Sequence, residues 1–315
     1  MIAAVVPCFR VKEKILDVLA GIGPSIERIY VVDDRCPDGT GAHVQESCRD
    51  PRVKVLFNPE NRGVGGAMVT GYRAAIKDGA SIVVKLDGDG QMDPRLIPKF
   101  LKPILDGKAD YAKGNRFFVL ESLKSMPLAR LFGNAVLSFV NKLASGYWNV
   151  MDPTNGYTAI HVSALKLLPL DKIDARYFFE SDMLFRLNTI RAVVEDVPMD
   201  AVYAGERSSL RIARVAALFP GKYFARFMKR VFYNYFLRDF NPGSIQLVTG
   251  LSMIVAGAWF GIEQWHSGAV AGSPATSGTV MLASLPVLLG FQLLLSALNF
   301  DIQNVPNKPI YPQFE

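Results

Sequence analysis

Cysteine and histidine are both scarce in this sequence of 315 residues, with three of each. Cys8, Cys36 and Cys48 form no CxxC pair, and their odd number argues against a disulfide framework and against a thiolate metal site. The histidines are scattered without zinc-ligand spacing, so we expect no zinc chemistry. The N-terminal segment MIAAVV reads as a strand and lacks the charged n-region of a signal peptide, so no signal peptide is predicted.

Charge is missing from a long C-terminal stretch. No charged residue occurs between Phe240 and Ile262, and a second apolar run follows Glu263. Each run is long enough to cross a bilayer core of about 30 Å. A buried helix pair in a soluble core is the alternative. The pattern predicts a transmembrane hairpin within residues 244–300, with helices at about 244–264 and 278–300.

Positive charge is concentrated just before these apolar runs. The net charge of +6 suits nucleic acid, anionic lipid or phosphorylated substrates equally well. The basic residues that decide among them lie beside the first apolar run rather than over the N-terminal part, which argues against nucleic-acid binding: Lys222, Arg226, Lys229, Arg230 and Arg238. The spacer between the runs has neither Lys nor Arg, so the positive-inside rule places the N-terminal domain and a tail at 301–315 in the cytoplasm. We expect an integral protein of the inner or plasma membrane.

Residues 213–239 carry an apolar stripe at helical spacing, with basic residues on the other face. This pattern favours an amphipathic juxtamembrane helix over an ordinary core stripe. The stripe comprises Phe224, Phe227, Met228, Val231, Phe232, Tyr235 and Phe236. Small residues on the first apolar run, among them Gly250 and Gly257, could support close helix contact and leave a homo-oligomer open.

Residues 1 to about 120 alternate between short apolar runs and helix-like segments, which predicts an α/β domain with a parallel sheet, extending to about residue 212. Ligands bind such sheets at the carboxyl ends of the strands. Polar or glycine-rich loops follow the four apolar runs: Pro7 to Arg10, Asp33-Asp34, Asn61 to Gly66, and Asp87 to Gln91. These loops are predicted to converge on one edge of the sheet.

The loop after the fourth apolar run has the chemistry of a divalent-metal site. Asp87 and Asp89 are separated by one glycine, and Gln91 adds an amide oxygen. Mg²⁺ and Mn²⁺ take one or two carboxylates and complete their octahedron with phosphate oxygens and water. The pattern therefore predicts Mg²⁺ or Mn²⁺ held together with a diphosphate.

Two other loops leave alternatives open. The glycines at 63, 65 and 66 match neither a dinucleotide fingerprint nor a P-loop, so tight helix packing and contact with a phosphate are both open. Asp33 and Asp34 could cap a turn, or could accept a hydrogen bond from a base or ribose.

Six motifs, VVPCF, VVDD, NRGVGGA, DGDGQMDP, GNR and DPTNGY, occur in this order. As an ordered set they resemble the family-2 inverting glycosyltransferases with the GT-A (Rossmann-like) fold, and in particular the branch that glycosylates polyprenyl phosphates. The similarity covers roughly residues 1–212, and the two-helix tail is similar to that of bacterial members.

The resemblance implies roles for individual residues. The nucleotide sugar would contact Pro7, Phe9, Asp34, Gly65, Asp87 and Gly88, and the metal would be held by Asp87, Asp89 and Gln91. The acceptor phosphate would be bound by Arg116, Arg130 and Asn134, together with a mobile loop containing Arg207, Ser208 and Ser209. Asp89, Arg116, Glu180 and Asp182 would lie at the reaction centre. One departure is Arg10 to Glu13, where the family usually has Asn-Glu; Arg10 could approach a diphosphate or remain on the surface.

The implied activity is inverting transfer of a hexosyl group from a UDP- or GDP-sugar to undecaprenyl or dolichyl phosphate, for cell-envelope glycan or glycoconjugate assembly. A phosphate acceptor is already largely anionic at neutral pH, so Asp182 would orient groups rather than remove a proton. The alternative is a membrane glycosyltransferase that extends a polysaccharide or glycolipid at an alcohol. The QxxRW segment of processive synthases is absent from the sequence.

Overall fold

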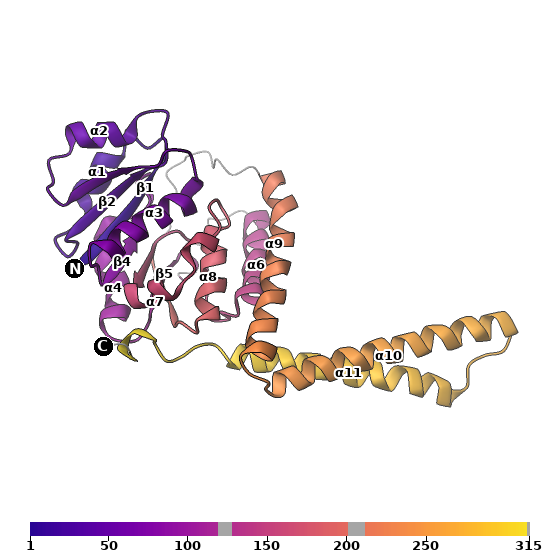
Figure 1. The fold of residues 1–315 in the computed structure, drawn as a ribbon. Helices are drawn as coiled ribbons and strands as arrows, with labels where there is room; N and C mark the ends of the chain where they lie inside the picture. Colours follow the sequence, from indigo (N-terminus) through magenta and orange to yellow (C-terminus); the bar gives the residue numbers. More distant parts are fainter. Residues whose placement is uncertain (119–127, 201–211, 314–315) are drawn as a thin grey trace. The chain divides into compact units, whose positions relative to one another are not determined.

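A computed structural model describes residues 1–118, 128–200 and 212–313 (Figure 1). The chain divides into two compact units. The first, here called the sheet unit, comprises Met1–Arg230 with Pro306–Glu315, and the second, the hairpin unit, comprises Val231–Val305.

The sheet unit is built on seven strands in the order β3-β2-β1-β4-β6-β5-β7. All neighbouring strands are parallel except β6, which runs antiparallel to both β4 and β5. The strands are β1 (Ile2–Cys8), β2 (Arg28–Asp33), β3 (Val53–Phe57), β4 (Ile82–Lys85), β5 (Tyr111–Asn115), β6 (Thr158–His161) and β7 (Val194–Pro198).

Helices cover both faces of this sheet, which is why β1 reads as a continuous apolar run. On one face Ala4 and Val6 join a core cluster with residues of α1 and α4. On the other face a Cβ atom added to Gly71 of α3 would lie 2.3 Å from Val5 Cγ1, so the helix backbone lies very close to the strand. The helices are α1 (Ile15–Gly21), α2 (Thr40–Ser47), α3 (Gly63–Lys77), α4 (Ile97–Leu105), α6 (Leu128–Ser145), α7 (Val162–Leu167), α8 (Phe179–Thr189) and α9 (Ile212–Phe232).

The C-terminal segment is part of the sheet unit rather than a separate tail. The backbone N–H groups of Ile310 and Tyr311 donate to Asp110 Oδ1 at 2.8 and 3.0 Å. The Tyr311 ring stacks on His161 with centroids 4.1 Å apart, and its hydroxyl donates to the Ile104 carbonyl. Residues 310 and 311 of the predicted 301–315 tail therefore pack beside β5, β6 and α4.

Helix α9 covers most of the predicted amphipathic segment and is followed by a π-helical turn at Tyr233–Leu237. Several of its apolar side chains are exposed, with 66 % of Phe224 and 53 % of Phe232 accessible, whereas Tyr223 is buried. Three of its basic residues contact the sheet unit: Lys222 pairs with Asp174, Arg226 with Asp182, and Arg230 donates to the Leu143 carbonyl. These three belong to the basic residues that the sequence concentrates before the first apolar run, and each has a partner within the protein.

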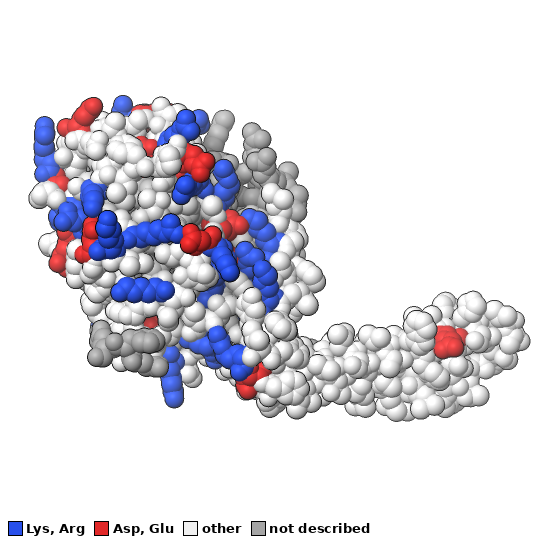
Figure 2. All heavy atoms as spheres, in the orientation of Figure 1, with Lys and Arg blue, Asp and Glu red and all other residues white. Residues whose placement is uncertain are grey.

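The hairpin unit consists of α10 (Pro242–Ala271) and α11 (Ser277–Gln303), and α10 extends beyond the predicted end near residue 264. The mean hydropathies of 1.7 and 2.0 make both helices apolar enough to cross a membrane, and only 11 % of each apolar window is buried. Figure 2 shows almost no charge on this unit. A Cβ atom on Gly250 would lie 2.9 Å from the Gly290 carbonyl oxygen, and one on Gly257 would lie 2.8 Å from that of Ala283. Both glycines thus serve close packing inside the hairpin.

Candidate active site

The loop after β2 is organised by two adjacent carboxylates. Asp33 accepts the N–H groups of Cys36 at 2.7 Å and Gly41 at 2.6 Å, which fixes the path into α2. Asp34 is 3 % exposed and accepts from Arg62 N at 2.9 Å and Gly63 N at 2.6 Å. Because the first N–H groups of a helix have no partner inside it, Asp34 stabilises the start of α3. The nucleoside contact expected for Asp34 stays a prediction, and its observed contacts give it a loop-building role.

The glycine-rich loop at the start of α3 is shaped by packing. A Cβ atom on Gly65 would lie 2.1 Å from the Asp174 carbonyl oxygen, and Gly66 N donates to the Ala175 carbonyl at 3.1 Å. Gly63 has φ of +80°, a conformation that side-chain-bearing residues rarely adopt. Of the two alternatives left open by the sequence, tight packing is the one that the structure displays.

The end of β1 presents an exposed aromatic ring. Pro7 is partly buried within the strand, whereas the next loop leaves 43 % of Phe9 exposed. The Arg10 guanidinium lies over the Phe9 ring at 5.4 Å. Arg10 and Arg35 both have positive φ, at 60° and 52°. Such backbone conformations are uncommon outside glycine and cluster at functional sites.

The acidic loop after β4 contains the predicted metal ligands. Asp87 Oδ1 accepts from Lys85 Nζ at 2.7 Å, and 29 % of the Asp87 side chain is exposed. Asp89 is partly exposed, and its Oδ1 accepts from Gln91 N at 3.0 Å. Gly88 lies against β1 and α1, where an added Cβ atom would be 3.0 Å from Ile15 Cδ1.

This loop suits a metal that brings its own further ligands. Among the residues that the structure describes, no three or more His, Cys, Asp or Glu side chains gather into a ready-made metal cluster. Two carboxylates and one amide fit Mg²⁺ or Mn²⁺ bound together with a diphosphate, because these ions keep phosphate and water oxygens as ligands. Zinc or a thiophilic metal would require a different donor set.

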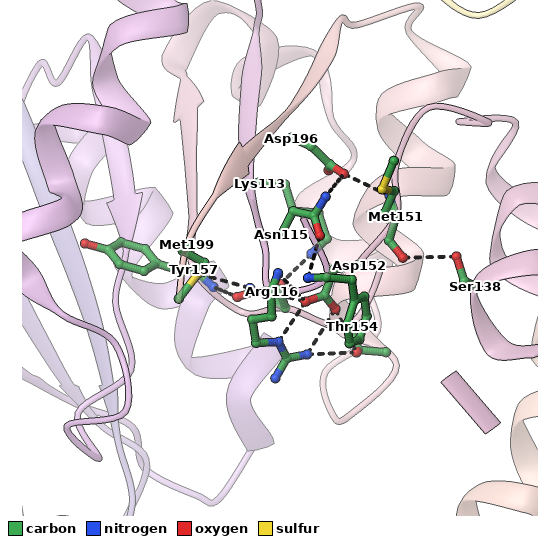
Figure 3. Close-up of polar contacts among 12 residues, drawn as sticks. Lys113, Asn115, Arg116, Ser138, Met151, Asp152, Thr154, Tyr157, Asp196 and Met199 are labelled. Carbon is green, nitrogen blue, oxygen red and sulfur yellow. Dashed lines mark hydrogen bonds and ion pairs between the residues drawn. The ribbon is translucent and has the colours of Figure 1, made fainter. Parts of the chain in front are cut away.

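Arg116, just beyond β5, is held by a fully buried carboxylate (Figure 3). Its Nε and Nη2 donate to the two oxygens of Asp152 at 2.7 and 3.0 Å, and Nη2 lies 3.5 Å from Thr154 Oγ1. The Arg116 side chain is 29 % exposed, while Asp152 is 0 % exposed. The bidentate pair fixes the plane of the guanidinium and joins the GNR and DPTNGY motifs.

The two acidic residues of α8 have different surroundings. Asp182 is fully buried and accepts from Asp174 N at 2.9 Å, from Arg186 Nε at 2.8 Å and from Arg226 Nε. Glu180 lies with Oε1 3.6 Å from Lys85 Nζ, and burial raises its pKa, although Lys85 and Lys113 oppose that shift. These contacts favour a structural role for Asp182 and place Glu180 beside the acidic loop.

For most of the other residues predicted to bind the acceptor phosphate, the structure describes no side-chain position. Arg207, Ser208 and Ser209 lie outside the described residues, as does the side chain of Arg130. Asn134 lies partly exposed on α6.

Residues 3–168 match the family model of glycosyl transferase family 2, which is more than half of the chain. The chain belongs to glycosyl transferase family 2. It is therefore a glycosyltransferase, as the ordered motifs predict.

Two relatives of this family-2 chain carry names that state a substrate. A UDP-N-acetylglucosamine–dolichyl-phosphate N-acetylglucosaminyltransferase from Methanococcus voltae is 30 % identical over 217 residues, covering 64 % of this chain and 86 % of that protein. An undecaprenyl-phosphate mannosyltransferase from Micrococcus luteus is 31 % identical over 176 residues, covering 55 % of this chain and 71 % of that protein.

The fold of the sheet unit is also found in solved structures. Glucosyl-3-phosphoglycerate synthase from Mycobacterium tuberculosis, in complex with Mn²⁺ and UDP-glucose, aligns with a TM-score of 0.57 at 18 % identity, covering 72 % of this chain and 79 % of that chain. Together with the family match, this likeness confirms the predicted GT-A fold.

Three charged residues at this family-2 site were not among the residues predicted from the sequence. Asp152 is part of the DPTNGY motif, but the motif alone does not identify Arg116 as its partner. Lys85 and Lys113 are fully buried on β4 and β5. Burial lowers the pKa of Lys113 to about 8. The available signal was a lysine inside each of two strand-like runs, since lysine is almost never buried without a partner.

Proposed function

We propose that the chain transfers a hexosyl group, with inversion, from a UDP- or GDP-sugar to a polyprenyl phosphate. The observation that carries this proposal is a family-2 domain followed by a nearly charge-free helical hairpin, in a chain whose relatives are named for dolichyl- and undecaprenyl-phosphate acceptors. A soluble acceptor would not require an apolar hairpin. The lipid product would supply sugar to cell-envelope glycan or glycoconjugate assembly.

The donor would lie at the carboxyl edge of β1, β2 and β4. Phe9 offers an exposed ring against which a nucleobase could stack, beside the partly buried Pro7. Asp34, Gly65 and Gly88 support this edge through the contacts described above. Asp89 and Gln91, with Asp87, would hold a divalent metal, either Mg²⁺ or Mn²⁺, and when bound it neutralises charge on the departing nucleoside diphosphate.

The acceptor phosphate supplies the nucleophile. One of its oxygens forms a bond to the anomeric carbon as the bond from that carbon to the diphosphate oxygen breaks, which inverts the configuration. The second pKa of a phosphate monoester is about 6, so the attacking oxygen needs no general base. This agrees with the engaged state of Asp182, whose oxygens accept from two arginines.

Arg116 is the proposed contact to the acceptor phosphate. Its guanidinium is always charged and can present paired donors to phosphate oxygens. Asp152 fixes its orientation, so less side-chain freedom is lost on binding. Arg130, Asn134 and the segment with Arg207, Ser208 and Ser209 stay predicted helpers of Arg116.

The hairpin would anchor the enzyme at the surface where a lipid-linked phosphate lies. We propose that α10 and α11 span the membrane with both ends in the cytoplasm, since Glu263 is the single Asp, Glu, Lys or Arg residue from 241 to 300 and the spacer lacks Lys and Arg. The exposed aromatic side chains of α9 suit the headgroup region. An oligomer through the hairpin stays a prediction.

The deciding experiment uses the detergent-purified full chain. Panels of UDP- and GDP-sugars would be incubated with undecaprenyl and dolichyl phosphate, with and without EDTA, and products identified by mass spectrometry. A sugar monophosphoryl polyprenol formed only without EDTA is expected. Product formed on polyprenol or another alcohol but not on polyprenyl phosphate would instead support the alternative function.

Arg116→Ala tests the acceptor role within the same assay. The KM for polyprenyl phosphate should rise about 10-fold or more, because a charged hydrogen-bond partner is worth roughly 1.5–3 kcal/mol. The KM for the nucleotide sugar should change far less. Arg73→Ala is the matched control, since Arg73 is an exposed arginine on α3 paired with Asp171. Equal effects on both substrates would contradict the assignment.

A further inference from the structure

Lys85 is a fully buried cation at the end of β4, directly before the acidic loop. Its Nζ donates to Asp87 Oδ1 at 2.7 Å and to the Gly156 carbonyl at 3.0 Å, and lies 3.6 Å from Glu180 Oε1. One ammonium group thus joins three segments that are distant in the chain: the acidic loop, the DPTNGY turn and the start of α8.

The sheet register explains how a lysine reaches this position. Lys85 on β4 and Lys113 on β5 are both paired with Thr158, the first residue of the strand between them. Directly paired residues share a face of the sheet, so both ammonium groups lie on the same side. Lys113 Nζ donates to the Asn155 carbonyl, and Lys85 donates to the next carbonyl of the same turn.

The turn is shaped to admit the Lys85 ammonium group. A Cβ atom on Gly156 would lie 2.5 Å from Lys85 Nζ and 2.9 Å from Asp87 Oδ2. Any side chain at 156 would therefore displace the ion pair between Lys85 and Asp87. A buried charge is costly unless it is paired and hydrogen-bonded, and here two carboxylates and a carbonyl supply the partners.

We propose that Lys85 is a positioning residue for donor binding, which sets the direction of the Asp87 carboxylate. The hydrogen bond from Lys85 Nζ to Oδ1 restricts rotation of the Asp87 carboxylate. The inference rests on the proposed function in one respect, namely that Asp87 supports the nucleotide diphosphate sugar and its metal. Glu180, with Oε1 3.6 Å from the same Nζ, is a second carboxylate beside the lysine.

Position and charge make opposite predictions for Lys85→Met. If Lys85 contributed only charge, its removal would make the site more negative and would tighten binding of Mn²⁺ alone. If it positions Asp87, removal frees the carboxylate and weakens binding of Mn²⁺ both alone and with nucleotide. A misplacement of about 1 Å can cost about 10²-fold in rate.

The test is a double-mutant cycle with Lys85→Met, Asp87→Asn and the combined variant, in the full detergent-purified chain. Calorimetry would measure binding of Mn²⁺ alone and of Mn²⁺ with UDP and with GDP, and kcat/KM would be measured for transfer. Each single variant should weaken nucleotide binding at least about 10-fold and lower kcat/KM about 10²-fold. The combined variant should be no worse than the poorer single variant, because residues that act as a unit are not additive.

Lys113→Met provides the matched control. Lys113 has the same side chain, burial and register, but its ammonium group donates to the Asn155 carbonyl rather than to Asp87. Its effect should therefore add to that of Asp87→Asn. If Lys85→Met does not fold, Lys85→Arg keeps the charge while moving the donor atoms, and should still weaken nucleotide binding.

Three results would overturn the inference: additive effects of Lys85→Met and Asp87→Asn, tighter binding of Mn²⁺ alone in Lys85→Met, or wild-type binding in Lys85→Arg when Lys85→Met does not fold. The binding cycle needs no lipid acceptor. If the wild type binds nucleotide but glycosylates no polyprenyl phosphate, the proposed function fails while the binding cycle still decides the role of Lys85.

Discussion

The two acidic segments of the sheet unit hold the same type of residue in opposite surroundings. Asp87 and Asp89 stand in a loop after β4 and are partly exposed. Asp182, in the first turn of α8, is fully buried and accepts from two arginines. A carboxylate whose two oxygens already accept from two guanidinium groups has little capacity left for a ligand, whereas a partly exposed one can bind a metal. The comparison teaches that burial and partners, rather than residue type, separate binding carboxylates from structural ones.

The largest effect on the free energy of unfolding is expected from substitution of the buried Asp182. Asp182→Ala should lower the free energy of unfolding by about 3–5 kcal/mol, because Arg186 and Arg226 would lose their shared partner. Thermal and chemical unfolding of the detergent-purified chain, followed by circular dichroism, measures it. Asp106→Asn, which removes an exposed carboxylate paired with Lys102, should leave the free energy of unfolding close to that of the wild type. Wild-type stability together with lost transfer would reverse the comparison and make Asp182 a reaction-centre residue.

Substitution of the partly exposed Asp89 should instead reduce activity and leave stability almost unchanged. Asp89→Asn should lower kcat by about 10²–10³-fold, since a metal ion stabilises several kcal/mol of developing charge. Its unfolding free energy should stay within about 0.5 kcal/mol of the wild type, as for other surface changes. Transfer of radiolabelled sugar and the same unfolding assay give both values. Full activity in this variant would remove Asp89 from the metal site.

Asp196 is an intermediate case that sharpens the comparison. Its Oδ2 accepts from Asn115 Nδ2 at 3.0 Å and from Met151 N at 2.9 Å, while its buried Oδ1 has no hydrogen-bond partner among the described residues (Figure 3). Burial raises the pKa of Asp196 to about 6 from the usual 3.8. This partly buried carboxyl group has no arginine partner in the part of the chain that the structure describes.

The pH dependence of stability follows from this shift. Because the folded state holds the proton more tightly, the contribution of Asp196 is complete below pH of about 4 and is lost as pH rises through about 6. The total change is at most about 3 kcal/mol at about 1.4 kcal/mol per pKa unit. The free energy of unfolding should be measured for the wild type and for Asp196→Asn from pH 4 to 7. The value for the wild type should fall relative to that of the variant across this range. Parallel stability curves would show that Asp196 titrates normally.

Much of the sheet and of the site could be predicted from local patterns. The apolar runs predict β1 to β4, and the residues after them predict the loops at the carboxyl edge, including Asp87 and Asp89. The strand β6 has only two apolar residues, Ala159 and Ile160, between Thr158 and His161, so it does not stand out as an apolar run. Its pairing with two neighbours follows from contacts between distant segments, as does the return of Tyr311 to Asp110.

The sequence alone was a weaker guide to whether a residue in a motif binds a ligand or stabilises the fold. Asp34 and Gly65 occur in motifs that resemble those of nucleotide-binding family members, yet their observed contacts are with the start of α3 and with the 174–175 segment. Likewise, the sequence shows basic residues of α9 beside the first apolar run, but it does not show that three of them contact the sheet unit. A sequence pattern shows that a charge is present, and the partner determines what that charge does.

The sequence by itself determined the alternation of strands and helices over residues 1 to about 120, the acidic loop, the apolar hairpin and the family. Those features depend on periodicity, hydropathy and short motifs, all of which are local in the chain. Only the tertiary structure decided that Arg116 is held by Asp152, that Asp182 accepts from two arginines and that Lys85 joins Asp87 to Glu180. These contacts join residues from different elements, and their energies depend on burial, which no local pattern specifies.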